Sequence, residues 1–299
     1  MRWMFHVARP ETIAWDADDR YAPASLAREG FIHASYRDAI EASARRYFAA
    51  GEELALFAID PRRLDVAVEV VATPRGPMPH IHGAIARDAM TALGWGALAA
   101  HDDHVRGTRI GFAAFEGMTL LDLIGPLDAL ARIASMGFDP STTCEVFALT
   151  DGPAGRAVWA GAGLEVRAAR VRPPLDGFEV LIVPGGAGTR ALQHDAAVTA
   201  YLATYPRNRL IASVCTGALL LGAAGRLTGR RATTHASARG ELARFGATAV
   251  DDRVVDEGQV VSAGGVTSGL DLGVHLVRRL AGDDVAAAIA RQMELPGGR

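Results

Sequence analysis

Cys215 has the sequence context of a nucleophile. It stands directly between an apolar run at 211–214, predicted to be a buried strand, and a helical pattern at 216–224. So sharp a change from strand to helix places the connecting side chain on a tight bend, near helix N–H groups that have no partner within the helix. These N–H groups and the helix dipole favour the thiolate over the thiol. The same pattern also suits a small apolar side chain in the core.

Two other predicted strand ends carry groups that could work with this cysteine. Asp122 lies among apolar residues just before a helix predicted at 126–135, and Gly185 and Gly186 follow a short apolar strand. Strand ends and helix N-termini gather at one edge of a parallel sheet, so we expect these residues beside Cys215. A carboxyl group there could exchange protons, and exposed glycine N–H groups could bind an anion. Alternatively, Asp122 could cap its helix and the glycines could simply turn the chain.

Predicted strands and helices alternate after residue 105, as in an α/β domain with a central parallel sheet. Strands are expected at 110–115, 145–150, 180–183, 211–214 and 258–263, helices at 126–135, 216–224, 269–280 and 284–293, and a Gly-rich hairpin region between 150 and 180. Pro126 suits the first turn of its helix, where a missing N–H costs nothing. The hydrophobic pattern lapses near 101–104, which predicts domains at 1–104 and 105–299.

Composition narrows the class of partner. A net charge of −3 with scattered Lys and Arg predicts no nucleic acid or anionic membrane partner. Two cysteines in unlike contexts, Cys144 and Cys215, argue against a disulfide framework and for a reducing compartment, and no apolar run reaches membrane-spanning length, so we expect a cytoplasmic protein. His101 and His104 flank two aspartates, but a metal site needs more converging ligands, and a solvated linker without metal is expected.

Several segments in the second half resemble the ThiJ/PfpI superfamily, and more narrowly its isonitrile (isocyanide) hydratase branch. They are LDLIGP at 121–126, VPGG at 183–186, SVCTG at 213–217, RATTH at 231–235 and GGVTSGLD at 264–271. This resemblance implies a flavodoxin-like sandwich of the class I glutamine amidotransferase-like type, a homodimer, no cofactor and a nucleophilic Cys215. Asp122 matches the aspartate of that branch, where many other relatives have glutamate.

The resemblance implies a lyase that hydrates isonitriles to N-formamides. The Cys215 thiolate would add to the terminal carbon and Asp122 would protonate that carbon, forming a thioimidate that water then hydrolyses. Gly186 and Thr216 would supply N–H groups near developing charge, with Gly185 beside them, and the Thr216 hydroxyl could orient the cysteine or the substrate.

Histidine placement separates this branch from its relatives. Thr216 follows Cys215, whereas protease-like and amidotransferase-like relatives have a histidine next to the cysteine or a Cys-His-Glu arrangement, so peptidase chemistry is disfavoured. His235 is the nearest candidate base in the sequence. The resemblance makes it a structural residue beside the substrate more readily than a proton carrier.

Other functions stay open. A glyoxal-directed or stress-related activity would have Cys215 attack an aldehyde carbon, and a non-catalytic ligand or redox sensor would oxidise it reversibly. A related branch of transcription regulators carries a helix-turn-helix region after a similar domain. Because the sequence ends a few residues after its last predicted helix, we expect no DNA binding through such a region.

The first hundred residues resemble a small bacterial family of unknown function, thought to share the ADP-ribosyltransferase-like fold, and predict a compact α+β domain. The matching stretches lie at 4–7, 21–35, 54–61 and 79–83. His6, His33 and His80 could line a polar cleft that binds a nucleotide or another small ligand, or could be ordinary hydrogen-bonded residues at strand ends. His80 and His82 alternate along an extended segment, so they should share a face.

Overall fold

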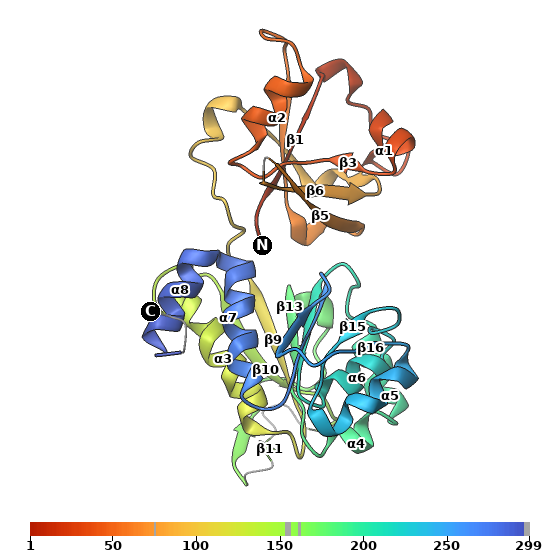
Figure 1. Ribbon diagram of the computed structural model, residues 1–299, viewed down its shortest axis with the longest axis vertical. Helices are drawn as coiled ribbons and strands as arrows, with labels where there is room; N and C mark the ends of the chain where they lie inside the picture. The colour runs from red at the N-terminus through yellow and green to blue at the C-terminus, as the bar shows by residue number, and fades with distance from the viewer. Residues whose placement is uncertain (75, 153–156, 161–162, 296–299) are drawn as a thin grey trace. The chain divides into compact units, whose positions relative to one another are not determined.

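The computed structural model describes residues 1–299 except 75, 153–156, 161–162 and 296–299. The chain divides into two compact units, Met1–Val105 and Arg106–Arg299 (Figure 1). Within the described residues, no helix is both long enough and apolar enough to cross a bilayer.

A six-stranded sheet forms the centre of the second unit, in the order β10-β9-β13-β14-β18-β17. Its strands are β9 (Arg109–Ala114), β10 (Thr143–Ala148), β13 (Val180–Val183), β14 (Leu210–Val214), β17 (Val254–Asp256) and β18 (Val260–Ala263). All neighbours are parallel except β17 and β18. The first five strands have the flavodoxin-like order, which confirms the predicted fold class. In such sheets ligands bind at the carboxyl ends of the strands where the order reverses, here between β9 and β13.

Helices cover both faces of this sheet, and the central strands are therefore almost wholly apolar and buried. On one side lie α3 (Leu120–Ser135), α7 (Ser268–Ala281) and α8 (Asp283–Gln292); on the other lie α4 (Thr189–Leu192), α5 (Ala196–Ala203) and α6 (Gly217–Ala223) (Figure 1). Asp195 begins α5, which the sequence did not predict, by accepting the N–H of Ala197 at 2.8 Å.

The helix α3 begins six residues before its predicted start, with Thr119 as its N-cap. Pro126 is therefore inside the helix, so its expected place in the first turn is wrong, and the carbonyl four residues before it loses its usual helical partner. The proline is accommodated where α3 crosses α7 closely. A Cβ on Gly273 would lie only 3.0 Å from the Cα of Pro126. The early start brings Asp122 into the first turn of α3.

Smaller elements complete this unit. The Gly-rich region contains an antiparallel hairpin of β11 (Ala157–Trp159) and β12 (Glu165–Arg167), and the parts of that region at 153–156 and 161–162 lie outside the described residues. A short parallel pair, β15 (Arg231–Ala232) and β16 (Thr248–Ala249), flanks the 3-10 segment η6 (Ala236–Phe245). The residues between β15 and η6 come close to the turn at Cys215.

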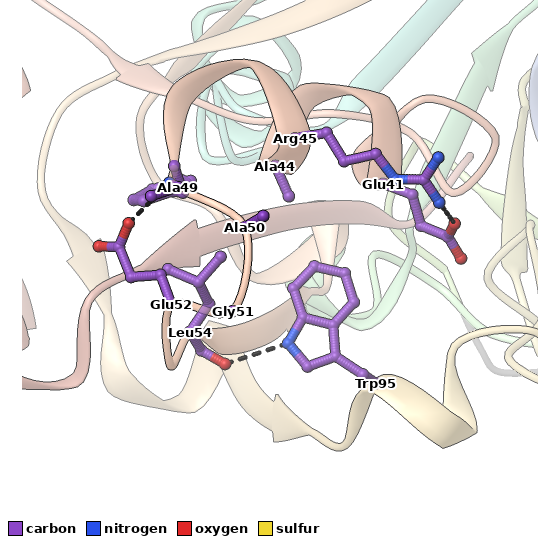
Figure 2. A pocket seen from close by; sticks show the side chains of 10 residues that line it. Glu41, Ala44, Arg45, Ala49, Ala50, Gly51, Glu52, Leu54 and Trp95 are labelled. Carbon is purple, nitrogen blue, oxygen red and sulfur yellow. Dashed lines mark hydrogen bonds and ion pairs between the residues drawn. The ribbon is translucent and has the colours of Figure 1, made fainter.

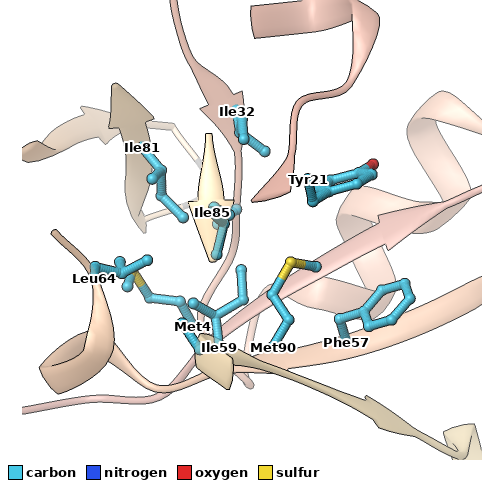
Figure 3. Close-up of a cluster of buried hydrophobic side chains, with 11 residues drawn as sticks. Met4, Tyr21, Ile32, Phe57, Ile59, Leu64, Ile81, Ile85 and Met90 are labelled. Atoms are coloured by element: carbon cyan, nitrogen blue, oxygen red, sulfur yellow. The ribbon is translucent and has the colours of Figure 1, made fainter. Parts of the chain in front are cut away.

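The first unit has the predicted α+β character. Its sheets have the orders β1-β4-β8, β3-β6-β5 and β2-β7, and all of their pairs are antiparallel. The strands are β1 (Met4–Ala8), β2 (Arg20–Tyr21), β3 (Ile32–His33), β4 (Ala55–Ile59), β5 (Ala67–Thr73), β6 (Gly76–His82), β7 (Ile85–Ala86) and β8 (Met90–Leu93), with helices α1 (Ala24–Glu29) and α2 (Ile40–Tyr47). Side chains from several of these strands, including Ile32, Ile59 and Ile81, meet in one apolar core (Figure 3).

Candidate active site

The backbone at Cys215 is held in an unusual conformation on the turn between β14 and α6. Its φ of +55° lies in the left-handed region, which costs a residue with a Cβ about 1–2 kcal/mol. Two carbonyl groups at the end of β18 fix this bend, because the Cys215 N–H donates to the oxygens of Ala263 at 3.0 Å and Gly264 at 2.9 Å. The side chain is 5% exposed. The sharp bend predicted from the sequence is therefore present.

The thiol of Cys215 is directed at two N–H groups and one carboxyl group. Burial and the carboxylate of Asp122 raise its pKa, and the N–H groups of Thr216 and Val266 lower it by a smaller amount. The net pKa is above the ordinary thiol value, so the predicted resting thiolate is wrong. The N–H of Thr216 at the start of α6 and the N–H of Val266 in the loop after β18 do stabilise the thiolate, but desolvation outweighs them. Val266, with φ +31°, was not among the predicted site residues.

Asp122 is a fully buried acid that faces this thiol. Burial raises its pKa to about 6, against the N–H of Gly185 and the thiol of Cys215, which both lower it. Its Oδ2 accepts the Gly185 N–H at 3.1 Å, and Oδ1 has no hydrogen-bond partner among the described residues. The carboxyl group thus bonds to the end of β13 instead of to its own helix, whose N-cap is Thr119, and the helix-capping interpretation is wrong.

The glycines after β13 hold other site groups in place. Gly185 donates to Asp122, and Gly186 donates its N–H to Oγ1 of Thr216 at 2.9 Å. Both N–H groups are therefore hydrogen-bonded within the site, and the role expected of Gly186, an N–H near developing charge, stays a prediction. Close packing explains the residue type: a Cβ on Gly185 would lie 2.5 Å from the Thr216 nitrogen, and Gly186 has φ +125°.

His235 lies beside the site and packs against the loop that contains Gly265. Its Nδ1 accepts the Ser237 N–H at 3.3 Å and lies 2.8 Å from the Ser237 hydroxyl oxygen, which leaves the proton of the neutral ring on Nε2. The half-buried ring covers Gly265, where a Cβ would lie 2.9 Å from Cδ2. Gly265 precedes Val266, so His235 supports the loop whose N–H meets the Cys215 sulfur. Among the described residues, the His235 ring makes its hydrogen bonds to Ser237 and none to Asp122 or Cys215.

His101 and His104 flank two aspartates near the end of the first unit. No group of three or more His, Cys, Asp or Glu side chains is placed to hold a metal ion in the part of the chain that the structure describes. The His101 ring packs edge-on against Trp3 at 5.1 Å and Phe5 at 5.3 Å between ring centroids. A solvated linker is therefore the wrong description of His101, which belongs to the packing of the first unit.

The histidines of the first unit fall into two environments. His6 is buried between the His33 carbonyl oxygen, 2.7 Å from Nδ1, and the Tyr21 hydroxyl, 2.9 Å from Nε2, and burial lowers its pKa to about 4. It therefore does not line a cleft. His33 and His80 approach each other, with ring centroids 5.6 Å apart.

His80 and His82 share a face of β6, as their alternation predicted. The Phe31 ring stacks on His80 with centroids 3.8 Å apart and lies 5.8 Å from the His82 ring. Glu69 pairs with His82 at 3.3 Å. This aromatic cluster lies on the sheet formed by β3, β6 and β5.

A separate cavity of about 340 Å³ lies in the first unit, and sequence reasoning did not find it. Most of the residues that line it are apolar, and it lies between α2 and the loop that follows (Figure 2). Trp95 closes one side and donates its Nε1–H to the Leu54 oxygen at 3.0 Å. Arg45 and Glu41 pair at 3.2 Å on the rim. The cavity is lined by Glu41, Ala44, Arg45, Phe48, Ala49, Ala50, Gly51, Glu52, Leu54 and Trp95.

The two units of the chain match the models of two different protein families. Residues 108–279 match the model of the DJ-1/PfpI family. Residues 6–93 match a model described as a protein of unknown function, DUF952.

Individual relatives agree with the first of these matches. An isonitrile hydratase of Pseudomonas putida is 35% identical over 187 residues, which cover 62% of this chain and 78% of the relative. A glutathione-independent glyoxalase DJ-1 of Schizosaccharomyces pombe is 26% identical over 122 residues, 40% of this chain and 63% of the relative. The crystal structure of a ThiJ/PfpI family protein from Pseudomonas syringae superposes with a TM-score of 0.56 at 31% identity, covering 70% of this chain and 82% of that one.

Proposed function

This chain belongs to the DJ-1/PfpI family, and from that membership we propose that it is a lyase that hydrates isonitriles to N-formamides through Cys215. The observation that carries the proposal is the buried acid–thiol pair, in which Asp122 and Cys215 shift each other's pKa. A pair of titratable groups in an enclosed site, one tuned close to neutral pH, is suited to general acid–base work. The similarity to an isonitrile hydratase supplies the substrate class.

The first half-reaction uses the proton that this pair holds. With the thiol pKa raised and the Asp122 pKa about 6, the proton rests on the sulfur at neutral pH and the carboxylate is ready to accept it. As the sulfur bonds to the terminal isonitrile carbon, Asp122 takes the thiol proton and passes it to that carbon. One carbon–sulfur bond forms, the carbon–nitrogen triple bond becomes a double bond, and the product is a thioimidate on Cys215.

The second half-reaction returns the site to its starting state. The Asp122 carboxylate takes a proton from water as the oxygen adds to the thioimidate carbon, and delivers it to the nitrogen. The carbon–sulfur bond then breaks, the N-formamide leaves, and the hydroxyl proton of the adduct returns to the sulfur through Asp122. The sum is one isonitrile and one water to one formamide. An acid with a pKa near 6 can serve as base and acid in the same cycle.

Backbone donors support the sulfur when it carries negative charge. The N–H groups of Thr216 and Val266 lower the thiol pKa, which means that they stabilise the thiolate relative to the thiol. That charge develops when the proton moves to Asp122 and again when the carbon–sulfur bond breaks. The Thr216 hydroxyl, fixed to Gly186, would orient the cysteine or the substrate from the same side of the turn.

An assay with two substrates tests this function against its alternatives. The purified full chain is incubated with an aryl isonitrile and, separately, with methylglyoxal, and the formamide and the remaining aldehyde are measured by chromatography. Formamide production is the expected result. Methylglyoxal turnover alone would favour the glyoxal-directed activity that the Schizosaccharomyces pombe relative suggests. Failure of both reactions together with ready oxidation of Cys215 would favour a sensor.

The proposed enzyme acts on a small molecule as a cytoplasmic homodimer. The family resemblance is the support for the dimer, and the reducing compartment suits a free Cys215. Light scattering on the purified chain measures the mass, and twice the 31.4 kDa of one chain is expected. A monomer with full activity would remove the dimer from the proposal without affecting the chemistry.

A further inference from the structure

Thr234 makes a buried hydrogen bond that the proposed reaction does not use. Its Oγ1 donates to the carbonyl oxygen of Cys215 at 2.7 Å, and its side chain is almost fully buried. The same carbonyl oxygen has one other contact, with the Ala218 N–H at 3.4 Å, which is long for a hydrogen bond. The threonine hydroxyl is therefore the principal partner of this carbonyl among the described residues.

That carbonyl belongs to the peptide group that joins Cys215 to Thr216. A peptide group is planar, so fixing the direction of its C=O also fixes the direction of its N–H, which points the opposite way. The N–H is the Thr216 donor directed at the Cys215 sulfur. The bend needs such support, since Cys215 has φ +55° and its own N–H is already fixed by the end of β18.

We propose that Thr234 is a positioning residue, which fixes the peptide between Cys215 and Thr216 and thereby aims the Thr216 N–H at the sulfur. The hydrogen bond from the Thr234 hydroxyl also polarises that peptide and strengthens its N–H as a donor. The inference rests on the proposed role of Cys215 as nucleophile. In this role Thr234 itself touches neither the substrate nor the sulfur.

The adjacent residue offers a matched control. Thr233 is equally buried, but its Oγ1 has no hydrogen-bond partner among the described residues, and its backbone N–H donates to the Ser262 hydroxyl at 2.9 Å. Thr233→Val therefore removes a buried hydroxyl without breaking a bond to the turn. Thr234→Val removes the bond with little change of shape, and Thr234→Ser keeps it.

Thiol reactivity is the readout, because it does not depend on which substrate the enzyme takes. Alkylation of Cys215 by iodoacetamide is followed over a range of pH by peptide mass spectrometry, with the half-buried Cys144 of the same molecules as reference. For Thr234→Val we expect the midpoint of the Cys215 alkylation profile to move to a higher pH by about one unit. At a fixed pH below the midpoint, this shift lowers the alkylation rate about tenfold. Thr234→Ser and Thr233→Val should keep the wild-type profile, and Cys144 should not change in any variant.

Three results would overturn the proposal. A wild-type Cys215 profile in Thr234→Val would show that the bond does not affect the sulfur. An equal change at Cys144, or in Thr233→Val, would indicate general loosening of the fold. If neither Thr234→Val nor Thr234→Ala folds, as judged by circular dichroism, while Thr234→Ser does, the bond serves the fold instead. If the wild-type chain does not turn over isonitriles, the proposed function is rejected. The alkylation profile of Cys215 would still test the positioning role of Thr234.

Discussion

Gly185 donates its N–H to Oδ2 of Asp122 at 3.1 Å, joining the end of β13 to the first turn of α3. This single bond holds one oxygen of a fully buried carboxyl group, while the other oxygen has no partner among the described residues. The Gly185 N–H and the Cys215 thiol together do not offset the loss of water around the acid, which is why the pKa of Asp122 rises to about 6. The acid is thus oriented by backbone and tuned by burial.

Replacing the nucleophile tests the covalent step. We expect Cys215→Ala to lower formamide production by at least about 10³-fold, because no other group on the turn can bond to the isonitrile carbon. The free energy of unfolding should change by less than about 1 kcal/mol, since alanine has the same backbone strain at this position. Cys144→Ala is the control, because Cys144 lies on β10 away from the turn, and it should keep wild-type turnover. Appreciable isonitrile loss in Cys215→Ala would remove the covalent intermediate.

Replacing the acid tests the proton transfers. Asp122→Asn can still accept the Gly185 N–H but cannot take a proton from the thiol or from water. We expect kcat to fall by about 10²–10⁴-fold, and intact-protein mass spectrometry should detect a slowly hydrolysing adduct of one substrate on Cys215. Turnover at the wild-type rate would show that the acid has no part in the reaction.

The pH dependence of turnover should report the same acid. Below its pKa of about 6, Asp122 is protonated and cannot accept the thiol proton, so kcat/KM should decline on the acidic side with a midpoint close to that value. The measurement is an initial-rate profile with an isonitrile at low concentration. A profile that stays flat well below the midpoint would exclude this acid as the base in the first half-reaction.

Stability should depend on pH through Asp122 with a definite sign. Its folded pKa of about 6 lies above the ordinary 3.8, so the folded state binds the proton more tightly than the unfolded state. Its contribution is therefore fully present below the unfolded pKa and is lost as the pH rises through the folded pKa. The shift corresponds to about 2–3 kcal/mol.

Asp122→Asn removes this titration and gives a direct comparison. The stability of the variant relative to wild type should increase by that amount, about 2–3 kcal/mol, between about pH 4 and about pH 7. Hydrogen exchange of peptides from α3 and β14, measured by mass spectrometry, reports this unit separately from the first one. A difference that does not change with pH would mean that Asp122 has an ordinary pKa in the folded chain.

The sequence predicts those parts of the site that adjacent residues determine. The bend at Cys215 follows from an apolar strand directly joined to a helical pattern. Asp122, which was expected at a strand end, lies instead in the first turn of α3. Its deep burial was not predictable, because that depends on how α3 packs against α7. The same burial is the reason why the thiolate prediction is wrong, since helix N–H groups are local features and desolvation is not.

Val266 shows a second limit of predicting the site from the sequence. Its N–H reaches the sulfur because β18 pairs with β14 in a register that matches Val214 with Ala263, which brings the following loop against the turn. No spacing within the sequence reveals a backbone donor supplied across a sheet. The early start of α3 was missed for a different reason: a proline inside a helix usually marks its first turn or its end, whereas here close helix packing accommodates it.

Gly185→Ala tests whether position 185 requires glycine because of close packing or because of backbone flexibility. A Cβ there would lie 2.5 Å from the Thr216 nitrogen and 2.8 Å from the Cys215 Cβ, so Gly185→Ala must displace the turn itself. We expect destabilisation by about 2–4 kcal/mol and loss of turnover. Gly177→Ala is the control, since a Cβ at Gly177 meets no atom within 4 Å and its φ is not positive. Urea unfolding and the formamide assay measure both variants, and equal stability of the two would show that the turn can yield without cost.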